Sequence, residues 1–166
     1  MSCFDFVVTD LDGTLFYDRE NICDRDRDAL HRLKAQGIRC AIATGRELDA
    51  VVPALDRLNL WDDFTHIIHS GGAGVYTIAT RENQMTGMLS IQTLCEIFDR
   101  YVDLGLSFVL PMDGKLYVSR RTALLENEAR LLCYPLVEVP DLKTIIYKPM
   151  NKIVLNAPLE DIDRAL

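Results

Sequence analysis

The sequence lacks any apolar run approaching the roughly 20 residues that a membrane-spanning helix requires. It also lacks the basic and apolar blocks of a secretory signal, because its first three residues lead directly into a short apolar segment. With 49% apolar and 26% charged residues, the composition is that of a globular protein. We therefore expect a soluble, cytoplasmic protein with no membrane partner.

Cysteine is present, but in no pattern that favours disulfides or a metal site. The number of cysteines is odd, and no two of them have the Cys-x-x-Cys spacing. Neither a disulfide framework nor a zinc site is expected. We interpret all of them as small apolar residues: Cys3, Cys23, Cys40, Cys95 and Cys133.

Basic residues are too few to form a surface for nucleic acid. The formal net charge is -7 and the pI is about 4.9, whereas binding to nucleic acid phosphates depends on clustered Lys and Arg. Nucleic acid is therefore not expected as a partner. A small anionic substrate is still compatible with this charge, because a metal ion and oriented amides can make one site locally positive.

The first half of the chain alternates between strand and helix signals. Residues 4–9 form a short apolar, β-branched run, and Asp24 is placed to cap a helix that ends at Gly37. A second apolar strand follows at 38–43, and a helix from Glu47 leads to a third strand at 66–69. This β-α-β-α-β order predicts an α/β fold with a doubly wound, Rossmann-like parallel sheet.

The second half has a different pattern, typical of an α+β unit. Its expected elements are a hairpin or irregular crossing at 75–88, a helix at 90–103, a hairpin at 107–119 that turns at Asp113-Gly114, a helix at 122–132, a strand at 152–155 and a helix from about Leu159. We expect a domain at 1–82 and an inserted α+β domain at 83–166.

Polar residues follow both of the first two strands, at Asp10-Leu11-Asp12 and at Thr44-Gly45-Arg46. Ligands in parallel α/β sheets bind beyond the carboxyl ends of the strands, so both clusters are expected at one rim. Asp10 and Asp12 are two residues apart, which puts their Cα atoms about 6 to 7 Å apart with the side chains on one side. Asp10 suits attack on phosphorus, and Asp12 suits proton transfer to and from the leaving oxygen and water.

Two carboxylates and a phosphate repel one another, so this chemistry requires a divalent cation. Mg²⁺ prefers a few carboxylates, phosphate oxygens and waters, and the Asp10 side chain and the Asp12 main-chain carbonyl are the local candidates for its ligands. Gly13 permits a tight turn with exposed amides. Thr44, which precedes a helix, can offer its hydroxyl and amide to phosphate.

At these residues the sequence resembles the haloacid dehalogenase superfamily. The first family motif is matched by Asp10-Leu11-Asp12-Gly13-Thr14-Leu15, and the second by Thr44-Gly45-Arg46 after an apolar strand. The Ser70-Gly71-Gly72-Ala73 segment and the α+β insert after it are similar to the Cof-type subgroup with a large α/β cap, which includes sugar-phosphate phosphatases.

The resemblance implies an Mg²⁺-dependent phosphomonoester hydrolase for a small phosphorylated metabolite such as a sugar phosphate. Asp10 would be the nucleophile and Asp12 the acid/base, both at the metal, and Thr44 would hold the phosphate. The other phosphate contacts would come from the same two motifs, at Leu11, Gly13, Gly45 and Arg46.

Two departures from the family pattern bear on activity. Gly71-Gly72-Ala73 stands where the subgroup commonly has Asn-Gly-Ala. The family's lysine motif and second acidic motif normally lie beyond the cap, and this chain is expected to stop within the cap, so the C-terminal part of the core would be missing. Lys148 and Lys152 are not assigned to the lysine motif. The 166-residue chain alone is therefore expected to be a weak or inactive catalyst.

Several residues have two interpretations. For Arg46, substrate contact and plain surface exposure are equally compatible with the pattern. Ser70 and the two glycines after it could line the phosphate pocket or simply form a turn. The histidines lack metal-ligand spacing and are interpreted as surface or strand-end residues: His31, His66 and His69.

Other functions also stay open. A phosphomutase would share both aspartates but would exclude water and return the phosphoryl group to the sugar. A binding or regulatory module would explain the missing motifs but has no need for the pair Asp10 and Asp12. A receiver-type phosphoacceptor domain would carry its aspartate on a later strand, where this chain has His69-Ser70.

Overall fold

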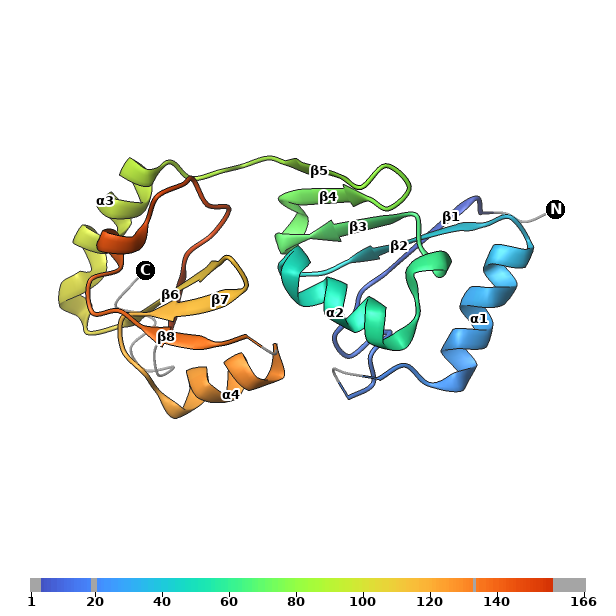
Figure 1. Ribbon diagram of the computed structural model, residues 1–166, viewed down its shortest axis with the longest axis horizontal. Helices are drawn as coiled ribbons and strands as arrows, with labels where there is room; N and C mark the ends of the chain where they lie inside the picture. Colours follow the sequence, from blue (N-terminus) through green and yellow to red (C-terminus); the bar gives the residue numbers. More distant parts are fainter. Residues whose placement is uncertain (1–3, 19–20, 133, 157–166) are drawn as a thin grey trace. The chain divides into compact units, whose positions relative to one another are not determined.

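The computed structural model describes residues 4–18, 21–132 and 134–156 (Figure 1). The chain divides into two compact units, Met1–Thr86 and Gly87–Leu166, each with its own sheet. This division lies a few residues after the expected boundary at 82/83, because residues 82–85 form a strand of the first sheet. The assignment of the units to a core and a cap stays a prediction.

The first unit contains a five-stranded mixed sheet in the order β1-β2-β3-β4-β5. Its strands are β1 (Phe6–Thr9), β2 (Arg39–Ala43), β3 (His66–His69), β4 (Gly74–Thr77) and β5 (Glu82–Met85). β1, β2 and β3 are parallel, and β4 and β5 add an antiparallel hairpin next to β3. The predicted α/β class is confirmed. The hairpin within residues 75–88 continues this sheet and does not belong to the second unit.

Two helices, α1 (Asp24–Ala35) and α2 (Leu48–Leu58), connect the parallel strands. Because the strands lie side by side in chain order, right-handed crossovers place both helices on one face of the sheet. The core on that face contains fully buried apolar side chains from the loop after β1, from β2 and β3, and from α2: Leu11, Phe16, Ile42, Val51, Leu55 and Ile67. Figure 1 shows α1 and α2 beside the sheet.

Two apolar side chains of β1 lie outside this core, because the side chains of this strand point alternately to the two faces of the sheet. Val7 packs against the buried cluster, whereas Phe6 and Val8 are 39% and 48% exposed. Successive side chains of a strand point to opposite faces, so Phe6 and Val8 lie on the face of β1 opposite this core.

Of the two predicted ends of α1, the start is corrected by one residue and the stop is confirmed. The N-cap is Cys23 rather than Asp24. Asp24 lies in the first turn, where an acidic side chain interacts favourably with the positive end of the helix dipole. The expected stop at Gly37 is confirmed, because Gly37 adopts φ +75° immediately after the C-cap Gln36.

Cys40, on β2, is 3% exposed, and burial raises the pKa of its thiol. A buried neutral thiol is unreactive. This agrees with the interpretation of this cysteine as a small apolar residue.

The second unit contains a four-stranded sheet in the order β8-β7-β6-β9, with two helices. Its elements are α3 (Ile91–Tyr101), β6 (Ser107–Met112), β7 (Lys115–Val118), α4 (Ala123–Leu131), β8 (Leu136–Glu138) and β9 (Val154–Asn156). Short 3₁₀ turns lie at Trp61–Asp63 and Ser70–Gly72 in the first unit, and at Val102–Leu104 (η3) and Leu142–Ile145 (η4) in the second.

The local signals of the second unit correspond to observed elements. Asp113 and Gly114, with φ +52° and +69°, form the turn between β6 and β7, and the hydroxyls of Ser90 and Thr122 cap α3 and α4. The expected strand at 152–155 is β9. The helix expected from Leu159, with Asp161 and Asp163, lies outside the described residues.

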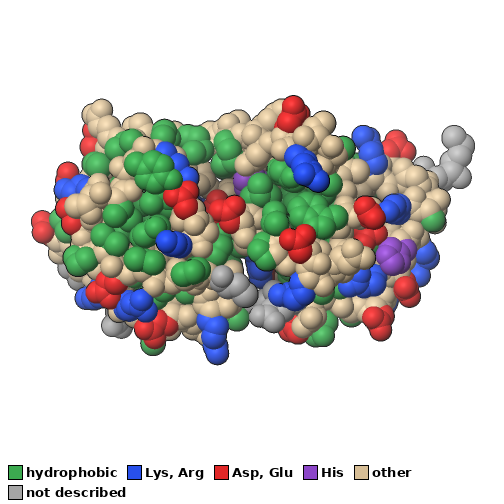
Figure 2. All heavy atoms as spheres, in the orientation of Figure 1, with side chains coloured by type: hydrophobic (Ala, Val, Ile, Leu, Met, Phe, Trp, Pro, Cys, Tyr) green, Lys and Arg blue, Asp and Glu red, His purple; other side chains and the backbone are tan. Residues whose placement is uncertain are grey.

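Apolar side chains form a separate core in this unit. The rings of Phe98 and Phe108 meet edge to face with centroids 4.8 Å apart, and Leu94 and Leu110 are fully buried beside them. Phe108 and the half-buried Tyr117 both pack in this core. Figure 2 shows that apolar side chains also gather on the visible face of this unit.

No helix in the described part of the chain is both long and apolar enough to cross a bilayer.

Val51 and Val52 give a matched test of the first core, because they are adjacent on α2 and differ in burial. Val51 is fully buried and Val52 is half-buried. We expect Val51→Ala to lower the free energy of unfolding by about 2 kcal/mol and Val52→Ala by less than half of that. Urea denaturation followed by the fluorescence of Trp61, the single tryptophan, measures this unit. Equal losses would contradict the assigned packing.

Candidate active site

The loop after β1 folds back against the strand and presents the side chain of Asp10. The amide of Leu15 donates to the carbonyl of Asp10 (3.2 Å), and the amide of Phe16 donates to that of Leu11 (2.7 Å). Leu11 and Phe16 are fully buried, so they anchor the loop, while Asp10 is exposed between them and the strand. Gly13 adopts φ +78°, which a side chain would disfavour.

Thr14 holds one oxygen of the expected nucleophile. Its hydroxyl donates to Asp10 Oδ2 at 3.2 Å. Within the described residues no hydrogen bond uses the other carboxylate oxygen, so it can accept a ligand. Sequence reasoning quoted Thr14 as part of a motif but assigned it no role.

Arg46 and Asp12 form a bidentate ion pair. Arg46 Nε donates to Asp12 Oδ2 at 2.8 Å, and Arg46 Nη2 donates to Asp12 Oδ1 at 2.6 Å. The Arg46 side chain is only 8% exposed, and its guanidinium lies 5.8 Å from the centre of the Phe16 ring. The surface interpretation of Arg46 is therefore wrong. Parallel pairing of β1 with β2 brings these two loops together.

Thr44 is buried where β2 ends, and its hydroxyl oxygen accepts one hydrogen bond. Its amide donates to Ile68 O (2.9 Å), and its Oγ1 accepts from the amide of Arg46 (3.1 Å). A hydroxyl that accepts one hydrogen bond still has a proton to donate. Thr44 can therefore donate to an anion at the rim that it shares with Asp10.

The segment after β3 is tied to the same rim. The amide of Ser70 donates to Arg46 O (2.8 Å), and the amide of Gly71 donates to Thr44 O (3.1 Å). Ser70 Oγ donates to Glu47 Oε2 at 2.5 Å. Ser70, Gly71 and Gly72 thus form a 3₁₀ turn, and their contact with phosphate stays a prediction.

His69 extends this network into the interior, which sequence reasoning missed. It is 2% exposed, its Nδ1 lies 2.9 Å from Ser70 Oγ, and its Nε2 lies 2.9 Å from Asn83 Oδ1. The His69 ring therefore joins Ser70, which follows β3, to Asn83 of β5. His69 is at a strand end, as expected, but it is not at the surface. Ile67 and His69 alternate as buried residues, so the period of two could have indicated this burial.

The other two histidines lie away from these contacts. The His31 side chain is 56% exposed, with Nε2 3.7 Å from Asp63 Oδ1, and His66 bonds to Thr65. Lys148, left unassigned from the sequence, donates to Asp113 in the second unit, and that bond lowers the pKa of Asp113.

The Asp10 carboxylate and the main-chain carbonyl of Asp12 are suitable ligands for a magnesium ion. No amide in the described part of the chain donates to the carbonyl of Asp12, so that oxygen and the Asp10 carboxylate can both act as ligands. Mg²⁺ retains several waters and needs few protein ligands. Among the described residues, no three His, Cys, Asp or Glu side chains gather as a metal site. The local donor set is therefore suitable for Mg²⁺ and supplies part of a coordination shell.

Together, three parallel strands and the polar groups at the carboxyl ends of the first two define an α/β protein with a candidate ligand site at that rim. The family model for haloacid dehalogenase-like hydrolases matches residues 7–166. The chain belongs to this family, as the motifs at Asp10 and Thr44 predicted.

Among known proteins, the chain is 30% identical over 118 residues to the Bacillus subtilis (strain 168) protein named "Putative phosphatase YxeH". That match covers 71% of this chain and 44% of the relative. The chain thus spans less than half the length of this curated relative.

Solved structures share the fold over nearly the whole chain. A haloacid dehalogenase-like hydrolase from Bacteroides thetaiotaomicron has a TM-score of 0.83 at 23% identity, with coverage of 97% of this chain and 61% of that chain. The structure of BT4131, described as a subclass IIB sugar phosphatase, has a TM-score of 0.70 at 17% identity. That match covers 96% of this chain and 61% of the BT4131 chain. At the level of fold, the predicted resemblance to the Cof-type subgroup is confirmed.

The Arg46–Asp12 pair can be tested by a double-mutant cycle with Arg46→Gln, Asp12→Asn and the double variant. Because Asp12 is partly exposed, we expect a coupling free energy of about 1 to 2 kcal/mol from urea denaturation. The exposed Arg39 is the control, and Arg39→Gln should not couple to Asp12→Asn. A coupling near zero for Arg46 would contradict the pair.

Proposed function

We propose that the protein is an Mg²⁺-dependent phosphomonoester hydrolase that forms an aspartyl-phosphate on Asp10. The observation that carries this proposal is the exposed Asp10 carboxylate at the end of β1, with Thr14 on one oxygen and Asp12 two residues away. Membership of the haloacid dehalogenase-like hydrolases supports the same chemistry.

The reaction would proceed in two displacements. In the first, Asp10 Oδ1 attacks phosphorus, the bond to the leaving oxygen breaks, and Asp12 gives that oxygen a proton. In the second, Asp12 removes a proton from water, which attacks phosphorus and releases phosphate from Asp10. Thr14 favours the first step because its bond to Oδ2 orients Oδ1 outward.

Asp12 must leave Arg46 to carry a proton. Both Asp12 oxygens accept from the guanidinium, and an oxygen that accepts a short charged hydrogen bond is not placed to protonate a substrate. We infer that an arriving phosphate competes with Asp12 for Arg46. Arg46 would then bind the phosphate, and Asp12 would be released for acid/base work.

The remaining phosphate contacts would come from groups at the same rim. The Thr44 hydroxyl has a proton to donate, and the amides of Leu11 and Gly45 belong to the two loops that meet there. The amide of Gly13, expected to be exposed, instead donates to the carbonyl of Phe16 (3.0 Å), so it is not a phosphate donor in this structure. The Asp10 carboxylate and the Asp12 carbonyl would hold Mg²⁺. When bound, this ion would neutralise charge on the phosphate oxygens.

A small phosphorylated metabolite, such as a sugar phosphate, is the proposed substrate class. The description of BT4131 as a sugar phosphatase supports this choice. The expected division into a core at 1–82 and a cap at 83–166 would make the second unit the part that selects the substrate.

The chain of 166 residues is expected to turn over slowly. No lysine of this chain is assigned to the family's lysine motif, and a lysine charge about 4 Å from phosphate contributes about 4 kcal/mol, roughly a thousandfold in rate. An assay of the chain with p-nitrophenyl phosphate and Mg²⁺ measures this deficit. A kcat in the range of about 1 to 1,000 s⁻¹, ordinary for enzymes, would contradict the expectation.

The role of Asp10 is tested in the same assay at high protein concentration. Asp10→Asn keeps the size of the side chain but removes the nucleophile, so it should abolish the residual phosphate release. Asp5→Asn, before β1, is the matched control and should retain it. Residual activity that survives Asp10→Asn would refute the proposed nucleophile.

A further inference from the structure

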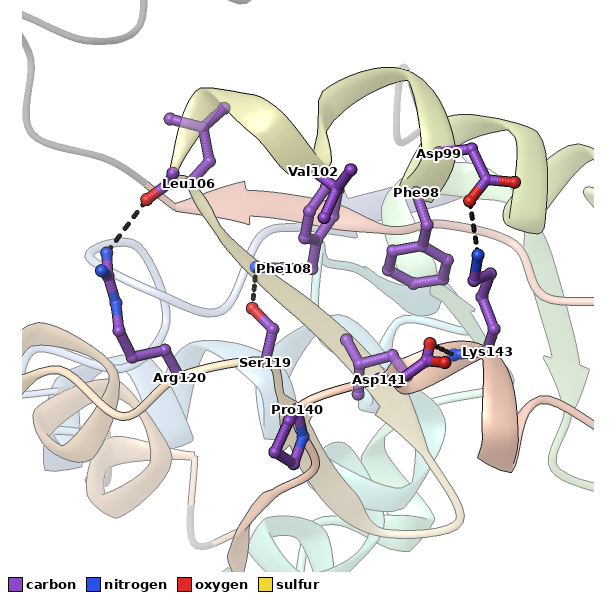
Figure 3. Close-up of a pocket in the computed structure, with 12 residues that line it drawn as sticks. Phe98, Asp99, Val102, Leu106, Phe108, Ser119, Arg120, Pro140, Asp141 and Lys143 are labelled. Carbon is purple, nitrogen blue, oxygen red and sulfur yellow. Dashed lines mark hydrogen bonds and ion pairs between the residues drawn. The ribbon is translucent and has the colours of Figure 1, made fainter.

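The second unit contains a pocket of about 420 Å³. It lies between α3 with η3, the start of β6, the end of β7 and the turn before η4 (Figure 3). Pockets for small ligands are typically about 300 to 1,000 Å³ and mostly apolar. This one has a suitable size, and all the residues that line it come from one unit.

One side of the pocket is apolar and well packed. Phe98 and Phe108 line it with their edge-to-face rings, and both are nearly fully buried in the core of the unit. Val102, in contrast, is 59% exposed although it lines the same pocket. An apolar ligand body would contact rigid aromatic rings and remove Val102 from water.

The charged residues of the pocket are unequally neutralised. Figure 3 shows Arg120 at one end of the row of apolar side chains and Lys143 at the other. Lys143 pairs with Asp99, and Asp141 accepts from the amide of Lys143 (3.1 Å). That end therefore carries no excess positive charge.

Arg120 is different because no carboxylate of the described residues pairs with it. Its Nη2 donates to the carbonyl of Gly105 at 3.0 Å, which orients the side chain beside the pocket. A guanidinium has five N–H donors, so others are left for an acceptor. Arg121, one residue later, instead approaches Glu126 and Glu138 and does not line the pocket.

We propose that this pocket binds a small ring compound that carries one carboxylate. The ring contacts Phe98, Val102 and Phe108, and the carboxylate accepts hydrogen bonds from Arg120. Two parallel N–H donors of an arginine match the two oxygens of a carboxylate. The site does not depend on Asp10 or on the proposed hydrolase activity.

The test uses the ¹⁵N-labelled chain and two probes that share a ring system, 2-naphthoate and the uncharged 2-naphthalenemethanol. Dissociation constants come from amide chemical-shift changes, which should gather at the lining residues. Arg120→Gln should weaken naphthoate about fivefold, as expected for one exposed charged contact, and leave naphthalenemethanol within about twofold. Arg121→Gln is the matched control and should change neither.

A second variant tests the ring position. Val102→Trp should fill the pocket and remove binding of both probes, while a dispersed amide spectrum confirms that the variant is folded. Three results would each overturn the proposal: shifts that gather elsewhere, equal effects of Arg120→Gln and Arg121→Gln on naphthoate, or unchanged binding to a folded Val102→Trp. If Val102→Trp unfolds, the comparison of naphthoate binding by Arg120→Gln and Arg121→Gln alone decides, because both arginines are exposed.

Discussion

The bidentate pair between Arg46 and Asp12 is the contact on which the geometry of the candidate active site depends. It joins the loops that follow β1 and β2, so it fixes the distance between the acidic motif and the Thr44 motif. The pair is possible because parallel pairing aligns Thr9 with Ile42, which brings both strand ends to one rim. The Arg46 side chain is almost buried and packs over Phe16, which limits its alternatives.

A second set of bonds supports the same rim from β3. Amides of Ser70 and Gly71 donate to carbonyls of the Thr44 segment, and His69 ties Ser70 to the β5 residue Asn83. Close packing here also explains a glycine, because a Cβ on Gly74 would lie 2.2 Å from the His69 ring. These bonds hold the Thr44 segment in place without a ligand, and under the proposed function such preorganisation would lower the cost of binding an anion.

Local sequence signals predicted most elements correctly, because each rests on nearby residues. Apolar spacing indicated the strands and helices, Gly37 marked a helix end, and Asp113-Gly114 marked a turn. Non-local pairing was harder to predict. The hairpin of β4 and β5 was recognisable as a hairpin, but whether it joins the first or the second sheet depends on β3. Two other features were missed for the same reason, because they also depend on residues that are distant in the sequence. They are the ion pair of Arg46 with a residue 34 positions away and the burial of His69.

The central claim is that Asp10 is the nucleophile that attacks phosphorus, and that Asp12 leaves its ion pair with Arg46 to transfer protons. A crystal structure of the chain with Mg²⁺ and beryllium fluoride, a mimic of a bound phosphoryl group, tests it most directly. The account predicts the fluoride adduct on Asp10, with Thr44 at its edge and Asp12 separated from Arg46. An adduct elsewhere, or one on Asp10 beside an intact Arg46–Asp12 pair, would contradict it.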